Sequence, residues 1–119
     1  VAGGPMMGRA VSNVDAPVTK GTSGVLLIPT EEALREKEGN CIRCAKCVEA
    51  CPMGLEPYLL NTLTQRGDYE ELESHWITDC IECGCCTFSC PSYLPLLDWV
   101  RIGKAEVMKR MRERAAAKK

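Results

Sequence analysis

Three features of the sequence predict a mainly α fold. Residues 52–79, which separate two groups of cysteines, have helical spacing and contain no alternating β-branched run that would form a hairpin. Residues 96–111 carry apolar side chains at intervals of three and four, the spacing of one helical face. Aromatic residues make up only 5% of the 119 residues, and the longest apolar run is Val25–Ile28. Something besides apolar burial must therefore help to organise the fold.

The first 29 residues are expected to lie outside the main domain. Residues 1–29 are rich in Gly, Pro, Val and Thr and lack helical periodicity, so we expect a loop and one short strand over Val25–Ile28. The sequence begins without methionine or a signal-peptide pattern, so we expect sequence upstream. Residues 1–29 are then the tail end of an upstream domain or a linker, and residues 30–119 form the main domain.

Capping and breaking residues predict four helices in the main domain. Thr30 caps a helix over residues 31–38, and Gly39 ends it. Pro57 begins a second helix, which stops at Gly67. Asp68 and Glu71 form a capping box for a short third helix that ends near His75. Pro95 begins the long C-terminal helix, whose apolar stripe consists of Leu96, Val100, Gly103, Val107 and Met111.

Charge is unevenly distributed, although the formal net charge is −1. Residues 101–119 hold eight basic and two acidic side chains, whereas residues 1–100 hold seven basic and fourteen acidic ones. An acidic body argues against a nucleic-acid partner. The basic C-terminal helix has two open interpretations: a solvated helix end, or a contact with an acidic partner or lipid headgroups. No apolar run approaches the roughly 18 residues of a membrane span, so no transmembrane segment is predicted.

The nine cysteines carry the clearest functional signal. Eight of them form the pattern C-x2-C-x2-C-x3-C-P twice, at an interval of 39 residues. In a reducing compartment, clustered thiols hold metals more often than they form disulfides. The first motif consists of Cys41, Cys44, Cys47, Cys51 and Pro52, and the second of Cys80, Cys83, Cys86, Cys90 and Pro91.

This spacing predicts two iron–sulfur clusters that are bound crosswise. Three thiolates separated by two residues can surround one corner of a cubane, and in two-cluster ferredoxins the fourth cysteine ligates the other cluster. We therefore predict an α-helical ferredoxin-like domain with two [4Fe–4S] clusters. Because crossed ligation joins the two halves, we expect the apoprotein to be largely unfolded. The first cluster is assigned to Cys41, Cys44, Cys47 and Cys90, and the second to Cys80, Cys83, Cys86 and Cys51.

Other candidate residues receive less specific interpretations. The ninth cysteine, Cys85, is interpreted as a bystander thiol, and an additional or redox-active ligand stays open as the alternative. His75 is interpreted as a surface or helix-end residue, and Met6 and Met7 as packing residues. No catalytic triad, phosphate loop or nucleotide fingerprint is found, so no catalytic residue is predicted. An apolar lid over the clusters is expected from Ile42, Val48, Ile81 and Phe88.

Five segments together resemble the RnfC (RsxC) family, which supplies one subunit of the Rnf ion-translocating ferredoxin:NAD oxidoreductases. The resemblance implies the C-terminal part of a peripheral subunit at the cytoplasmic side of the cell membrane, which passes electrons through two cubanes to membrane partners. It also implies FMN and NAD(H) in an upstream domain that these residues do not include. Only the eight motif cysteines carry over residue by residue. The segments are Gly3–Gly8, Pro17–Gly24, Cys41–Cys44, Cys51–Leu55 and Cys80–Gly84.

The expected function is therefore electron transfer in a membrane-associated oxidoreductase complex, with no substrate site in these residues. One alternative is the relay domain of a soluble flavoprotein reductase of the same family type, such as a cobalamin reductase. Another is a zinc-organised interaction module that docks through the basic C-terminal helix. Zinc needs two C-x2-C pairs for each ion and has no use for the third and fourth cysteine of each motif.

Overall fold

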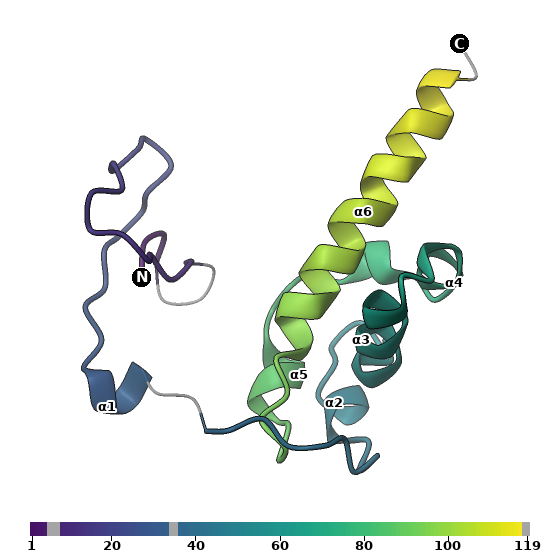
Figure 1. Cartoon of the computed structure of the whole chain (residues 1–119), viewed down its shortest axis with the longest axis horizontal. Helices are drawn as coiled ribbons and strands as arrows, with labels where there is room; N and C mark the ends of the chain where they lie inside the picture. Colours follow the sequence, from purple (N-terminus) through teal and green to yellow (C-terminus); the bar gives the residue numbers. More distant parts are fainter. Residues whose placement is uncertain (5–7, 34–35, 118–119) are drawn as a thin grey trace. The chain divides into compact units, whose positions relative to one another are not determined.

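The protein divides into two compact units, residues 1–36 and residues 37–119. The computed structural model describes residues 1–4, 8–33 and 36–117 (Figure 1). Its regular secondary structure in these ranges is helical, as the sequence predicted, and no strand is present there. The division falls later than the boundary expected after residue 29, because the short helix α1, Thr30–Ala33, belongs to the first unit.

The first unit is held by isolated backbone bridges. Ala2 pairs with both Arg9 and Val25, and the amide of Leu26 donates to the carbonyl oxygen of Val1 at 2.8 Å. The strand expected over Val25–Ile28 is thus reduced to one bridge residue, because the pairing does not continue along it. Met6 and Met7 lie outside the described residues.

Helix α1 is shorter than predicted. It covers Thr30–Ala33 and buries no residue, and residues 36–38 are not helical. The remaining two positions of the expected helix, 34 and 35, lie outside the described residues. A helix without a packed face gains little from its own hydrogen bonds, so capping signals alone do not extend it.

Helices of the second unit begin and end close to the predicted positions. α3 begins at Pro57 and ends before Gly67, whose φ of 78° gives the left-handed turn that glycine adopts without strain. Asp68 precedes α4, but its side chain makes no capping hydrogen bond, so this part of the prediction was wrong. The bounds are α2 Lys46–Glu49, α3 Pro57–Arg66, α4 Tyr69–Ser74, the 3₁₀ helix η1 Ile77–Asp79, α5 Cys85–Phe88 and α6 Leu96–Ala117.

The apolar core lies where α6 packs against α3, α4 and η1 (Figure 1). Leu96, Val100, Gly103 and Val107 of the predicted stripe are buried. Met111 is 42% exposed, because α6 continues past the helices that cover its earlier turns. No helix in the described part of the chain is long and apolar enough to cross a membrane. The core side chains that α6 covers are Leu60, Leu63, Leu72 and Ile77.

The 39-residue repeat extends from the cysteines to the backbone. Helices α2 and α5 begin at equivalent positions, as do α3 and α6. Each cysteine loop turns through the same left-handed backbone positions, which redirect the chain between successive thiols. The equivalent pairs with positive φ are Arg43 and Glu82, Ala45 and Gly84, and Gly54 and Tyr93.

Candidate metal centre

The first three cysteines of the first motif border one cavity together with the last cysteine of the second motif. This first cavity has a volume of about 170 Å³ and contains Cys41, Cys44, Cys47 and Cys90 in its wall. Cys41 and Cys44 are exposed at the loop, and Cys47 is buried within α2. These are the four cysteines that the sequence assigns to one cluster.

A second, smaller cavity of about 20 Å³ has the reciprocal arrangement. Its wall contains Cys80, Cys83 and Cys86 from the second motif and Cys51 from the first. Helix α6 contributes to both cavities, through Leu96 in the first and through Leu97 and Val100 in the second. The chain therefore brings each predicted set of four thiols to a separate cavity.

Backbone contacts between the motifs support this exchange. The amide of Gly39, just before the first motif, donates to the carbonyl oxygen of Ser92 at 2.9 Å. The hydroxyl of Ser89 lies 3.4 Å from the carbonyl oxygen of Lys46, which joins α5 to α2. Pro91 borders the first cavity and Pro52 the second, so each proline follows its cysteine to the opposite motif.

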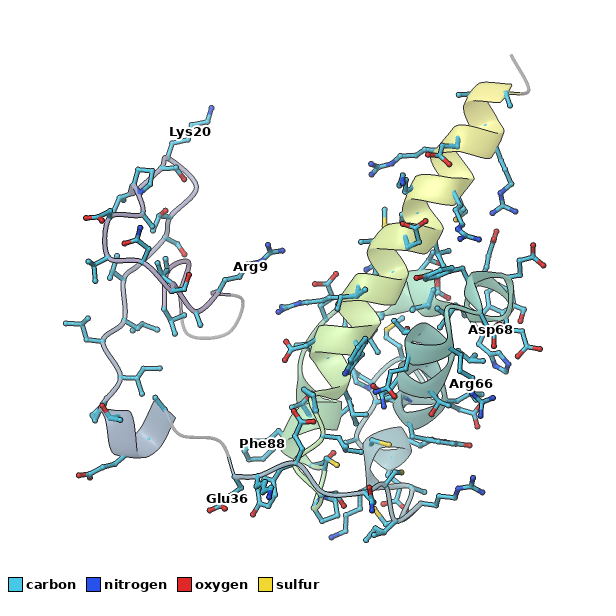
Figure 2. The ribbon with its side chains drawn as sticks, in the orientation of Figure 1. Arg9, Lys20, Glu36, Arg66, Asp68 and Phe88 are labelled. Carbon is cyan, nitrogen blue, oxygen red and sulfur yellow. The ribbon has the colours of Figure 1, made fainter. Side chains whose placement is uncertain are left out.

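The lid prediction was correct for two of its four residues. Ile42 borders the first cavity and Ile81 the second. Phe88 borders neither cavity and is 95% exposed; Figure 2 shows it projecting from α5 away from the helices. Val48, which is half-buried, also borders neither cavity. Both lie on the turns of α2 and α5 that face away from the thiols.

Sequence reasoning missed other apolar wall residues, although the repeat contains the signal for them. Tyr58 borders the first cavity, and its equivalent 39 residues later, Leu97, borders the second. Leu94 borders the first cavity and its equivalent, Leu55, the second. Extending the 39-residue comparison beyond the cysteines identifies these pairs. The two cavities therefore have equivalent walls, built crosswise like the thiol sets.

Burial controls the protonation of the inner thiols. It raises the pKa of Cys47 and of Cys80, and it raises the pKa of Cys86 to about 11. These thiols are neutral at pH 7 without a metal. Because the thiolate is the metal ligand, binding must displace their protons.

Four thiols around an apolar space fit the ligand chemistry of iron–sulfur clusters and of zinc, since both take soft thiolate donors. In the described ranges, no three His, Cys, Asp or Glu side chains meet closely enough to hold a single ion. The cysteines thus surround a space and do not converge on a point.

Two further residues lie where the sequence analysis expected them or close to it. His75 follows α4 and its amide donates to the carbonyl oxygen of Glu71 at 2.9 Å, as expected of a helix-end residue. Cys85 begins α5, is exposed and borders neither cavity, and the neighbouring thiol of Cys83 raises its pKa. Its interpretation as a bystander stays a prediction.

Comparison with known proteins gives the class and the family. Residues 33–91 match the 4Fe-4S dicluster domain family. With the helical fold and the two motifs, this match defines an iron–sulfur protein. The chain is 45% identical to the RnfC-type subunit of the proton-translocating ferredoxin:NAD(+) oxidoreductase complex of Clostridium ljungdahlii over 76 residues, 64% of this chain and 17% of that protein.

Two other relatives match over nearly the whole chain. The RnfC-type subunit of the Na(+)-translocating ferredoxin:NAD(+) oxidoreductase complex of Acetobacterium woodii is 41% identical over 113 residues, 95% of this chain and 26% of the relative. The RnfC-type subunit of the ion-translocating oxidoreductase complex of Yersinia enterocolitica is 43% identical over 123 residues, 100% of this chain and 18% of the relative. The chain belongs to the RnfC family. It spans about a fifth of the length of these relatives.

Proposed function

We propose that this chain is the electron-relay part of an ion-translocating ferredoxin:NAD oxidoreductase complex, with two [4Fe–4S] clusters bound crosswise. One observation carries the proposal: each cavity is bordered by three cysteines of one motif and the fourth cysteine of the other. The 4Fe-4S dicluster match and the relatives support the same function.

The residues divide the work of a relay between them. Thiolates of Cys41, Cys44, Cys47 and Cys90 hold the first cluster, and those of Cys80, Cys83, Cys86 and Cys51 hold the second. Each cluster, when bound, accepts and releases one electron. Apolar walls limit the access of water, which is one of the factors that set a reduction potential. Exposed Cys41, Cys44 and Cys83 keep one side of each site close to the surface, where electrons can enter or leave.

The family resemblance supplies the wider context of the proposal. The chain would work at the cytoplasmic side of the cell membrane, bound to other subunits of the complex. FMN and NAD(H) would bind in a domain upstream of these residues, and residues 1–29 would be the tail end of that domain or a linker. Residues 30–119 would form the two-cluster domain.

Iron and acid-labile sulfide analysis of the anaerobically reconstituted chain tests the proposal, together with EPR spectra after reduction. About eight of each per chain, with signals from two nearby reduced cubanes, is the expected result. About four of each would leave one motif without its cluster and contradict the two-cluster relay. Zinc without iron would reject electron transfer in favour of a zinc-organised interaction module.

A further inference from the structure

Three charged side chains meet beside the second cavity. Arg101 Nε donates a hydrogen bond to Glu82 Oε2 at 2.9 Å, and Lys104 Nζ lies 3.4 Å from Glu82 Oε1. Lys104 Nζ also donates to the carbonyl oxygen of Cys80 at 2.6 Å. The backbone amide of Glu82 donates to Cys80 Sγ at 3.4 Å. Helix α6 therefore holds the beginning of the second motif through contacts with two of its residues.

The lysine is placed where its charge acts on the cysteine. Its side chain is only 19% exposed, so water screens its field weakly. Burial raises the pKa of Cys80, and the amide of Glu82 and the positive charge of Lys104 both oppose that rise. Burial likewise raises the pKa of Glu82, but Arg101 and Lys104 outweigh this and hold it below its ordinary value. The three groups thus form a charged cluster with one excess positive charge.

The first motif has no equivalent cluster. The repeat places Arg43 at the position that corresponds to Glu82. The positions that correspond to the two cations hold Thr62 and Gln65, and each of these side chains bonds within α3. Thr62 donates to the carbonyl oxygen of Tyr58, and Gln65 donates to the side chain of an asparagine one turn earlier. The ionic contact with α6 is therefore specific to the second motif.

We propose that Lys104 is a positioning residue for the second cluster and raises its reduction potential without a comparable effect on the first. Reduction makes a cluster more negative, and a fixed, weakly screened cation beside one of its ligands stabilises that state. Glu82 orients the ammonium group and offsets part of its charge. This inference rests on the proposed function, because it requires Cys80 to be a cluster ligand.

Redox titration monitored by EPR tests the inference on the full chain with both clusters reconstituted. Lys104→Met removes the charge but keeps most of the length of the side chain, and Lys104→Arg keeps the charge. Lys109→Met is the matched control, since Lys109 lies on the same helix, is exposed and carries the same charge. Arg43→Gln removes a cation from the wall of the first cavity and identifies the reduction step that belongs to that site.

The expected result is a separation of the two reduction steps. Lys104→Met lowers one potential, Lys104→Arg restores most of the loss, and Lys109→Met moves neither step. Arg43→Gln lowers the other potential. Equal shifts of both steps in Lys104→Met, or no shift, would overturn the inference while two bound clusters left the proposed function intact.

A second variant covers the case in which Lys104→Met loses iron. Glu82→Gln leaves the two cations unopposed, so the step assigned to the second cluster should move upward. A downward shift or an unchanged potential would overturn the inference. If the wild-type chain binds no cluster at the second motif, the proposed function fails and the inference fails with it, and iron analysis detects this before any titration.

Discussion

The hydroxyl of Thr87 accepts a hydrogen bond from the backbone amide of Leu97 at 2.9 Å. Thr87 lies inside the second cysteine motif, and Leu97 is the second residue of α6. The first amides of a helix have no partner within it, so this hydroxyl acts as a cap from a distant part of the chain. The motif that borders the second cavity thereby also fixes the start of the longest helix.

Loss of this cap should destabilise the protein. Thr87→Val keeps the shape of the side chain but removes the acceptor, so we expect the free energy of unfolding to fall by about 1 kcal/mol. Urea unfolding of the cluster-loaded protein under anaerobic conditions measures the change. Thr87→Ser keeps the hydroxyl and should stay close to wild type. Equal midpoints for the Val and Ser variants would contradict the capping role.

Gly103 marks the closest approach of α6 to the rest of the core. A methyl group at this position would overlap the hydroxyl of Thr64 and would lie 3.0 Å from Ile77 and 3.1 Å from Leu72. The Thr64 hydroxyl cannot easily move, because it donates to the carbonyl oxygen of Leu60 at 2.8 Å. We therefore expect Gly103→Ala to destabilise by about 1–3 kcal/mol, although alanine is the better helix former.

A double-mutant cycle identifies the cause of this loss. Thr64→Ala removes the overlapping hydroxyl, so the Gly103→Ala substitution should cost less in that background than in the wild type. Chemical denaturation of the four proteins provides the comparison. Strictly additive effects would show that contact with Thr64 does not limit the approach of the helices.

The sequence predicts elements well where local chemistry decides them. Pro57 and Gly67 give the bounds of α3 because proline and glycine restrict or release the backbone directly. The apolar stripe of α6 is correct through Val107 and wrong at Met111, since periodicity does not tell how far the neighbouring helices extend. Phe88 was assigned to the lid by its proximity to the cysteines, but the turn of α5 directs it outward.

The pairing of the motifs is a long-range property that spacing alone leaves undecided between crossed and uncrossed ligation. It was predicted by analogy with two-cluster ferredoxins, and the walls of the two cavities support it because each contains residues from both halves of the repeat. The charged cluster around Lys104 was not predicted. Its three members are separated in sequence by up to 22 positions, and only the packing of α6 on the second motif brings them together.

Crosswise ligation makes Cys51 and Cys90 unequal once one cluster is removed. The double variant Cys41→Ser/Cys44→Ser should lose the first cluster and keep about four iron atoms in the second. Adding Cys90→Ser to this background should cost no further iron, whereas adding Cys51→Ser should remove most of it. Iron analysis and visible absorbance give the answer. If each motif held its own cluster, the two triple variants would exchange results.

Iron removal should unfold most of the second unit, because the apolar core and the second cavity share side chains. Leu60 and Val100 belong to the core and also border this cavity, and Cys51 and Cys80 pack against the same core. Without a cluster, the inner thiols lose the ligand that justifies their burial, and the remaining core is small for a chain of this length. Chelation under anaerobic conditions should therefore abolish most of the helical far-UV circular dichroism, and reconstitution should restore it.

The control separates metal loss from other effects of the chelator. A chelator saturated with calcium beforehand should leave both the spectrum and the iron content unchanged. The helix α6 extends beyond the core, and its exposed turns contribute helical signal only while the packed turns from Leu96 to Val107 are formed. A metal-free chain with an unchanged spectrum and a cooperative thermal transition would show that the apolar contacts of α3 and α6 suffice for folding, and that crossed ligation is added to a scaffold that forms without it.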